Sequence, residues 1–282
     1  MQTVIGLGKA GCNIADHLSQ YPQYQIKKLD VGLKKTKTTF GLKHQDGPEL
    51  YEKSNMPKGI NNFLEGVMPE TLFITSCGAV SGASLKILQK IHKKTKIMVM
   101  YVLPQKDDLV GEKLLQNNLL FNVFQEYARS GLLDRVFLVD NSKLSDIMGP
   151  VPILKFWDSM NHLIVTTYHM LNVFQNTRAV MTTQTKRIDT ARISTFGLLD
   201  PENNQEKMFF ELDIPREKSY YYGVPKKQLE EDPNLMEVIR KNLKCNIEHE
   251  KIKTTYSVHS TDYNELIAYC EKSSTLIQQL AV

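Results

Sequence analysis

A glycine-rich turn near the N-terminus has the residue types that bind phosphate. It follows an apolar run at residues 2–7 and reads Gly6, Leu7, Gly8, Lys9, Ala10, Gly11, Cys12, Asn13. Glycines let the backbone approach a phosphate closely, and a helix that starts at such a turn offers it unpaired N–H groups. Asp30 lies at the end of the next strand-like segment. Its separation along the sequence from the glycine-rich turn is close to that of the acid that binds a ribose hydroxyl in dinucleotide sites. Taken alone, this pattern fits a dinucleotide site or a tight turn without a ligand.

A second turn of small residues separates these alternatives. It follows a β-rich run at residues 71–75 and reads Ser76, Cys77, Gly78, Ala79, Val80, Ser81, Gly82. A dinucleotide fold needs one glycine-rich phosphate turn, whereas two such turns can close on a di- or triphosphate. A nucleoside polyphosphate is therefore the better ligand.

One aromatic residue and one amide could recognise a base. Trp157, the single tryptophan, and Asn161 are four residues apart in a predicted helix and share one of its faces. The ring could stack on a base while the amide reads the edge of the base. Without further context, a core tryptophan on a buried helix is the more frequent explanation of such a pair.

Alternating strand and helix patterns carry these residues. Strands are predicted at residues 2–7, 24–31, 71–75, 97–103, where Pro104 follows, and 136–139. Helical spacing occurs at residues 13–21, 60–67, 83–92 and 111–130, and polar sequence up to residue 58 predicts a loop with short helices. This alternation argues for a parallel sheet with helices on both faces.

The second part of the chain has a different character. A largely buried helix is predicted at residues 156–176, followed by strands at 192–198, 208–212, 219–224 and 253–259 and helices at 234–243 and 263–279. The predicted fold is α/β, with a mostly parallel sheet and a long central helix in a nucleotide-binding domain at residues 1–180. A smaller α+β domain follows at residues 181–282.

Composition limits the function classes. With 282 residues, 41% of them hydrophobic, the chain can bury a sizeable core. Lys and Arg number 35 against 31 Asp and Glu, an excess too small to indicate a nucleic-acid partner. The widely spaced Cys12, Cys77, Cys245 and Cys270 indicate free thiols in a reducing compartment. No apolar run approaches the roughly 18 residues of a membrane span, so we expect a cytoplasmic protein without membrane insertion.

In their order and spacing, these motifs resemble the tubulin/FtsZ superfamily over about the first 180 residues. Residues 8–11 are close to tubulin's GQAG turn, and the second turn lies where the family has its GGGTGTG loop. Further on, the family's KPFxFEGxxR segment is similar to LPQKDDLVGEKLLQ, and FtsZ's VDSLIVIPNDKLLKVLG is similar to GLLDRVFLVDNSKLSDIMG. The short C-terminal domain resembles phage- or plasmid-encoded members of the PhuZ and TubZ type.

The resemblance implies a site for GTP or GDP, with Mg²⁺ as a candidate companion ion. It also implies a head-to-tail filament of copies of this chain, with an unknown adaptor. In the family, an aromatic residue and an Asn or Asp at the spacing of Trp157 and Asn161 hold guanine. The residues expected to bind nucleotide are Gly8, Lys9, Ala10, Gly11, Cys12, Asn13, Asp30, Gly78, Ala79, Val80, Ser81, Gly82, Pro104, Gly111, Trp157 and Asn161.

Several departures from the family pattern predict altered chemistry. Val80 replaces a family glycine and is expected to crowd a phosphate. In the FEGxxR segment, Val110 falls at the glutamate and Leu114 at the arginine, so that only Gly111 remains.

The family's catalytic loop, NxDxxD in FtsZ, is best matched at residues 187–192. Asp189 takes the place of the first acid and Arg192 that of the second, which predicts slow hydrolysis because arginine cannot act as a base. A non-polymerising pseudo-GTPase scaffold and an NAD-dependent Rossmann oxidoreductase are the alternative functions.

Overall fold

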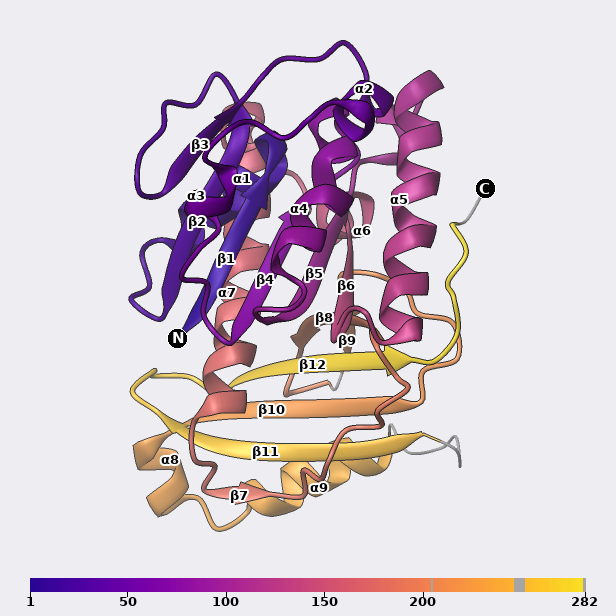
Figure 1. Cartoon of the computed structure of the whole chain (residues 1–282). Helices are drawn as coiled ribbons and strands as arrows, with labels where there is room; N and C mark the ends of the chain where they lie inside the picture. The colour runs from indigo at the N-terminus through magenta and orange to yellow at the C-terminus, as the bar shows by residue number, and fades with distance from the viewer. Residues whose placement is uncertain (204, 246–251, 281–282) are drawn as a thin grey trace. The chain divides into compact units, whose positions relative to one another are not determined.

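The strands of the chain fall into a parallel and a largely antiparallel set, carried by two units (Figure 1). The computed structural model describes residues 1–203, 205–245 and 252–280, without the side chains of 241–245. The first unit comprises residues 1–165 and the C-terminal residues from Ile277, and the second comprises Thr166–Leu276. The division lies inside the long helix, upstream of the boundary at residue 180 that the sequence predicts.

The first unit contains a parallel sheet in the order β3-β2-β1-β4-β5-β6. Its strands are β1 (Gln2–Leu7), β2 (Tyr24–Val31), β3 (Thr39–Leu42), β4 (Glu70–Thr75), β5 (Lys96–Leu103) and β6 (Arg135–Asp140). All of β1 is buried, and so is β4 except for Glu70, because helices cover both faces of a parallel sheet. The mostly parallel α/β sheet predicted from the sequence is confirmed.

Helix α4 lies in front of this sheet in Figure 1, α5 lies to the right of β6, and α1 lies behind the sheet. The α-helices are α1 (Gly8–Leu18), α2 (Pro48–Lys53), α3 (Ile60–Phe63), α4 (Ser84–Ile91), α5 (Gly111–Ser130), α6 (Asn141–Met148) and α7 (Phe156–Asn176). Short 3₁₀ turns are η1 (Ala79–Ala83), η2 (Lys106–Asp108) and η3 (Ile153–Lys155). The bounds of α5 and α7 match the predicted helices at 111–130 and 156–176.

The second unit contains the strand order β8-β12-β10-β11-β7, with β9 paired to β8. Its elements are β7 (Met181–Thr182), β8 (Ile193–Leu199), β9 (Glu206–Met208), β10 (Glu217–Pro225), α8 (Lys226–Glu231), α9 (Leu235–Cys245), β11 (Lys253–Thr261) and β12 (Ile267–Ser274). The β10–β11 pair is parallel, and the other pairs named here are antiparallel.

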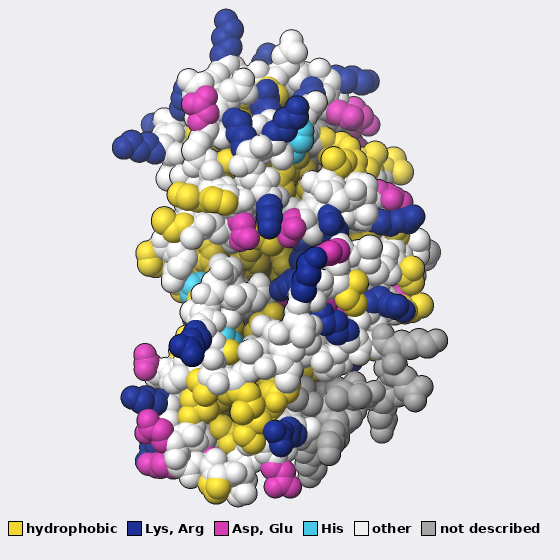
Figure 2. Space-filling view, turned by 60° about the horizontal axis from the view of Figure 1, so that its bottom comes forward, with side chains coloured by type: hydrophobic (Ala, Val, Ile, Leu, Met, Phe, Trp, Pro, Cys, Tyr) yellow, Lys and Arg dark blue, Asp and Glu magenta, His cyan; other side chains and the backbone are white. Residues whose placement is uncertain are grey.

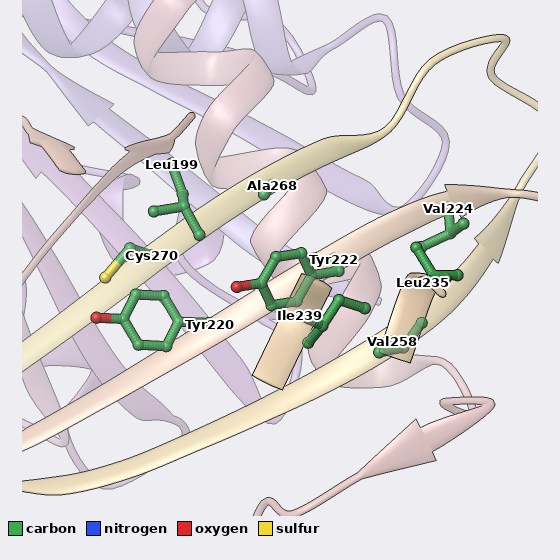
Figure 3. Packing of buried hydrophobic residues seen from close by; sticks show 9 residues of the cluster. All are labelled: Leu199, Tyr220, Tyr222, Val224, Leu235, Ile239, Val258, Ala268 and Cys270. Atoms are coloured by element: carbon green, nitrogen blue, oxygen red, sulfur yellow. The ribbon is translucent and has the colours of Figure 1, made fainter. Parts of the chain in front are cut away.

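One face of β10 forms a core with α9, as Figure 3 shows. Tyr220 and Tyr222 are two residues apart, so their side chains leave the strand on the same face. Leu235 and Ile239 of α9 are four residues apart and meet that face. Each fully buried apolar side chain of this size contributes about 1.5 to 3 kcal/mol to folding.

The structure overturns the helix predicted at residues 263–279, because Ile267–Ser274 form the strand β12. In the fold, Arg187 pairs with Glu271 and Glu206 pairs with Lys272, so both charged residues occupy strand positions. Three further differences from the sequence-based prediction occur. No strand was predicted at β3, and β9 starts at Glu206, two residues before the predicted strand at 208–212. Helix α1 starts at Gly8 instead of Asn13.

Cys12, Cys77 and Cys270 are buried free thiols, as predicted, while the side chain of Cys245 lies outside the described residues. Acidic and basic side chains are interspersed on the face drawn in Figure 2. Across residues 1–203, 205–245 and 252–280, none of the helices combines the length and hydropathy of a membrane span.

Candidate functional site

A cavity of about 560 Å³ opens in the first unit at the carboxyl ends of its strands. The residues that follow β1, β4, β5 and β6 line it, and these are Gly8, Ser76, Pro104 and Asn141. Asp30, near the end of β2, adds a carboxylate to the wall. Open α/β sheets bind their ligands at this edge, because the loops that follow the strands converge there.

The first turn enters the cavity as the start of α1. Gly8 follows β1 directly with φ +71°, a conformation that favours glycine. Leu7, at the N-cap of α1, makes no side-chain capping bond, so the first N–H groups of the helix can meet an anion. Lys9, Ala10 and Asn13 lie in the cavity wall.

The second turn meets the first at Val80. A methyl group built on Gly8 would lie 3.8 Å from the Cβ of Val80, and Gly78, Ala79, Val80 and Ser81 all line the cavity. The Ser81 N–H donates to the carbonyl of Gly78 at 2.8 Å, and the Gln116 Nε2 of α5 donates to Ser81 Oγ at 3.0 Å. These bonds fix the shape of the second turn beside the first.

Four of the predicted nucleotide residues lie outside the cavity wall, namely Gly11, Cys12, Gly82 and Gly111. Close packing accounts for two of these glycines. A Cβ atom on Gly11 would lie 2.3 Å from the carbonyl oxygen of Ile74, and a Cβ atom on Gly82 would lie 2.0 Å from the carbonyl oxygen of Pro48. Gly111 starts α5 with φ +55°.

The Cys12 thiol points into the backbone instead of the cavity. Its Sγ donates to the carbonyl oxygens of Gly6 and Leu29 at 3.5 and 3.6 Å. Burial raises the pKa of this thiol to about 12, so it stays protonated at neutral pH.

The first turn of α7 brings an aromatic face to the same cavity. Trp157, Met160 and Asn161 line it, and the tryptophan is 50% exposed while Met160 is 1% exposed. A core tryptophan would be buried, so the exposure of Trp157 leaves ring surface for a planar ligand. His17 Nε2 lies 3.2 Å from Asp158 Oδ1, which holds the start of α7 against α1.

The sequence reasoning missed Asn141, Asp108 and Lys113, which also line the cavity. Asn141 is 8% exposed, and its Oδ1 has no hydrogen-bond partner within the described chain. A buried acceptor without a partner at a cavity wall is suited to a ligand N–H. Asn141 lies two residues after the predicted strand at 136–139, and its place near the end of a strand is the signal that could have found it.

The fold of this chain is similar to that of several solved proteins. No family model and no curated protein sequence matches the chain. Among solved structures, a GTPγS-form protofilament of Bacillus thuringiensis serovar israelensis TubZ aligns with a TM-score of 0.72. The identity is 14%, over 97% of this chain and 86% of the other. The chain has the tubulin/FtsZ fold.

Two further structures support this fold. GDP-bound CetZ1 from Haloferax volcanii has a TM-score of 0.67 at 14% identity, covering 98% of this chain and 94% of CetZ1. FtsZ from M. jannaschii has a TM-score of 0.66 at 11% identity, covering 96% and 87%. The predicted resemblance to a divergent member of this superfamily is confirmed in the fold, with TubZ among the matching structures.

The tubulin/FtsZ fold of this chain carries the predicted catalytic loop in its second unit. Asp189 is exposed, and its Oδ2 accepts from Lys186 Nζ at 3.0 Å. The hydrogen bond and charge of Lys186 hold the pKa of Asp189 below its usual value. Arg192 Nε donates to the Asp189 carbonyl at 2.6 Å.

An ion pair between half-buried Arg187 and buried Glu271 anchors this loop to β12. Arg187 donates to both carboxylate oxygens of Glu271, at 2.8 and 2.9 Å. The Glu271 side chain is only 4% exposed, and a bidentate pair fixes the arginine in orientation as well as in position.

Within the described ranges, no three or more His, Cys, Asp or Glu residues cluster so that they could hold a metal ion. Mg²⁺ at this site would therefore depend on oxygens brought by a phosphate ligand, as this ion commonly does.

Proposed function

We propose that the chain binds GTP or GDP in the cavity of its first unit. One observation carries the proposal: two small-residue turns and an exposed tryptophan line a single cavity at the carboxyl ends of parallel strands. Such turns suit the phosphates of a nucleotide, and an aromatic face suits its base. The matching structures include TubZ in a GTPγS form and CetZ1 bound to GDP, which supports this ligand class.

Each part of the nucleotide has proposed partners in the wall. The backbone at Gly8 to Ala10 and at Gly78 to Ser81 would receive the phosphates, and Asp30 would accept from a ribose hydroxyl. Trp157 would stack on the base, with Asn161 and Asn141 at its polar edges. Mg²⁺ would bind through phosphate oxygens and supply charge neutralisation there.

We further propose that copies of the chain assemble head to tail, with the nucleotide between them. The TubZ structures are protofilaments and filaments, and a head-to-tail contact that does not close produces an open filament. In this arrangement, Asp189 would face the nucleotide of the next copy. With Arg192 in place of a second acid, hydrolysis would be slow.

Mass spectrometry of the nucleotide released from freshly purified protein tests the ligand. We expect GTP or GDP; bound NAD without guanine nucleotide would favour the oxidoreductase instead. Pelleting with GTP, with GDP and without nucleotide tests assembly. A chain that binds GTP and never pellets would be a non-polymerising scaffold, the alternative that Val80 in the cavity wall favours.

A further inference from the structure

Four ionisable side chains line the cavity, and two of them form a weak pair beside the second turn. These four are Lys9, Asp30, Asp108 and Lys113. Lys113 Nζ lies 4.0 Å from Asp108 Oδ2, and their side chains are 40% and 50% exposed. An ion pair with this long distance and this much exposure to water is weak, so Lys113 can readily leave Asp108 for a more strongly charged ligand.

Both charges act on the second turn. Burial raises the pKa of the Cys77 thiol; against this, the ammonium of Lys113 lowers it, and the carboxylate of Asp108 raises it further. Cys77 lies directly before Gly78, so both side chains are close enough to influence a charge at the turn. Lys113 would stabilise an anion there, and Asp108 would repel it.

The position of Lys113 is unexpected from the sequence. It precedes Leu114, the residue aligned with an arginine of the FEGxxR segment, and Leu114 lies outside the cavity wall. We propose that Lys113 is a phosphate-binding cation of this site, in addition to Lys9 of the first turn, and that Asp108 opposes it, so that the pair of Lys113 and Asp108 sets the preference for highly charged nucleotides. This inference rests on the proposed function.

The charge-removing variants Lys113→Met and Asp108→Asn test this with opposite expected signs. Affinity for GTP, GDP and guanosine is measured by calorimetry on the full chain. In Lys113→Met, GTP affinity should fall about 10-fold or more, the scale of one charge-assisted hydrogen bond, while guanosine affinity stays within about 2-fold. In Asp108→Asn, GTP affinity should rise and guanosine affinity should again stay constant.

Matched controls lie in the same segment. Lys106→Met and Asp107→Asn make the same charge changes at exposed positions outside the cavity wall. The proposed role of Lys113 is contradicted if Lys113→Met changes GTP affinity no more than Lys106→Met does. It is also contradicted if Lys113→Met lowers guanosine affinity as much as GTP affinity. Either result leaves the proposed nucleotide binding intact. If the wild-type chain binds none of the three compounds, the proposed function and this inference are both overturned.

Discussion

Gly11 of α1 lies so close to Ile74 of β4 that a methyl group on its Cα would be 2.3 Å from the Ile74 carbonyl oxygen. The two backbones touch where β4 leads into the second turn. This contact by itself requires a glycine at position 11. It also separates glycines that build the fold from those that border the cavity.

Gly11→Ala should therefore destabilise the fold, whereas Gly78→Ala should weaken nucleotide binding. Overpacking against a backbone carbonyl should lower the free energy of unfolding by about 3 kcal/mol, measured by urea denaturation. Among the described residues nothing lies within 4 Å of a Cβ on Gly78, so stability there should change by less than about 0.5 kcal/mol. A Gly11→Ala protein of normal stability, or a Gly78→Ala protein with normal GTP affinity, would contradict this division.

Trp157→Ala should weaken guanine nucleotide binding by about 1 to 3 kcal/mol, the usual scale for losing an aromatic stack on a base. Because Trp157 is the single tryptophan, intrinsic fluorescence of the wild type reports on the same contact. Leu154→Ala is the control, since Leu154 is 95% exposed and lies outside the cavity wall. Saturating GTP that leaves the emission unchanged would rule out the stacking role.

Replacing Arg192 by Asp should raise the rate of GTP hydrolysis. If acids of one copy polarise water at the nucleotide of the next, a single acid at Asp189 leaves the rate low, because one positioned acid or base contributes about 10² to 10⁴ in rate. Phosphate release is measured above the assembly concentration, with exposed Arg178→Asp as the charge-matched control. Brisk wild-type hydrolysis that falls in Arg192→Asp would show that this arginine assists catalysis by contacting phosphate.

Stability should fall on mild acidification because of buried histidines in the second unit. His259 stacks on Phe174 with ring centroids 4.7 Å apart, and its Nε2 lies 3.0 Å from Ser257 Oγ. Burial lowers the pKa of His259, and also that of His169, below the ordinary value of 6.5. The unfolded chain then binds more protons than the folded chain, so stability is fully present above pH 6.5 and is lost as the pH falls toward the folded-state pKa.

Urea midpoints measured between about pH 8 and pH 5 check this titration. His259→Gln should reduce the loss of stability on acidification, although it also removes the stack on Phe174 and lowers stability at every pH. His92→Gln, at an exposed position, is the control and should leave the pH dependence unchanged. An equal slope in wild type and His259→Gln would assign the acid sensitivity to other groups.

Much of the first unit is determined by local sequence. Continuous apolar runs specify buried parallel strands, and the helical pattern correctly predicts the bounds of α5 and α7. It does not predict the inner face of α5, where Gln116, Asn117 and Gln125 are buried. Leu115 and Leu119 of the same helix are exposed. The two small-residue turns are local as well, since each lies between a strand and a helix. The sequence therefore located the cavity edge and, with Trp157, its aromatic wall.

The tertiary structure alone decided which residues meet across distant segments. Glu271 is buried and Lys272 is half-buried in β12, where they pair with Arg187 and Glu206, and no local pattern contains those partners. Likewise, Lys113 belongs to the cavity and Leu114 does not, because the start of α5 at Gly111 sets which helical face turns inward. The sequence does not distinguish a glycine that is needed for a positive φ, such as Gly8, from one that is needed because another backbone lies close to it. The contact between Gly11 and Ile74, which only the tertiary structure shows, identifies Gly11 as the second kind.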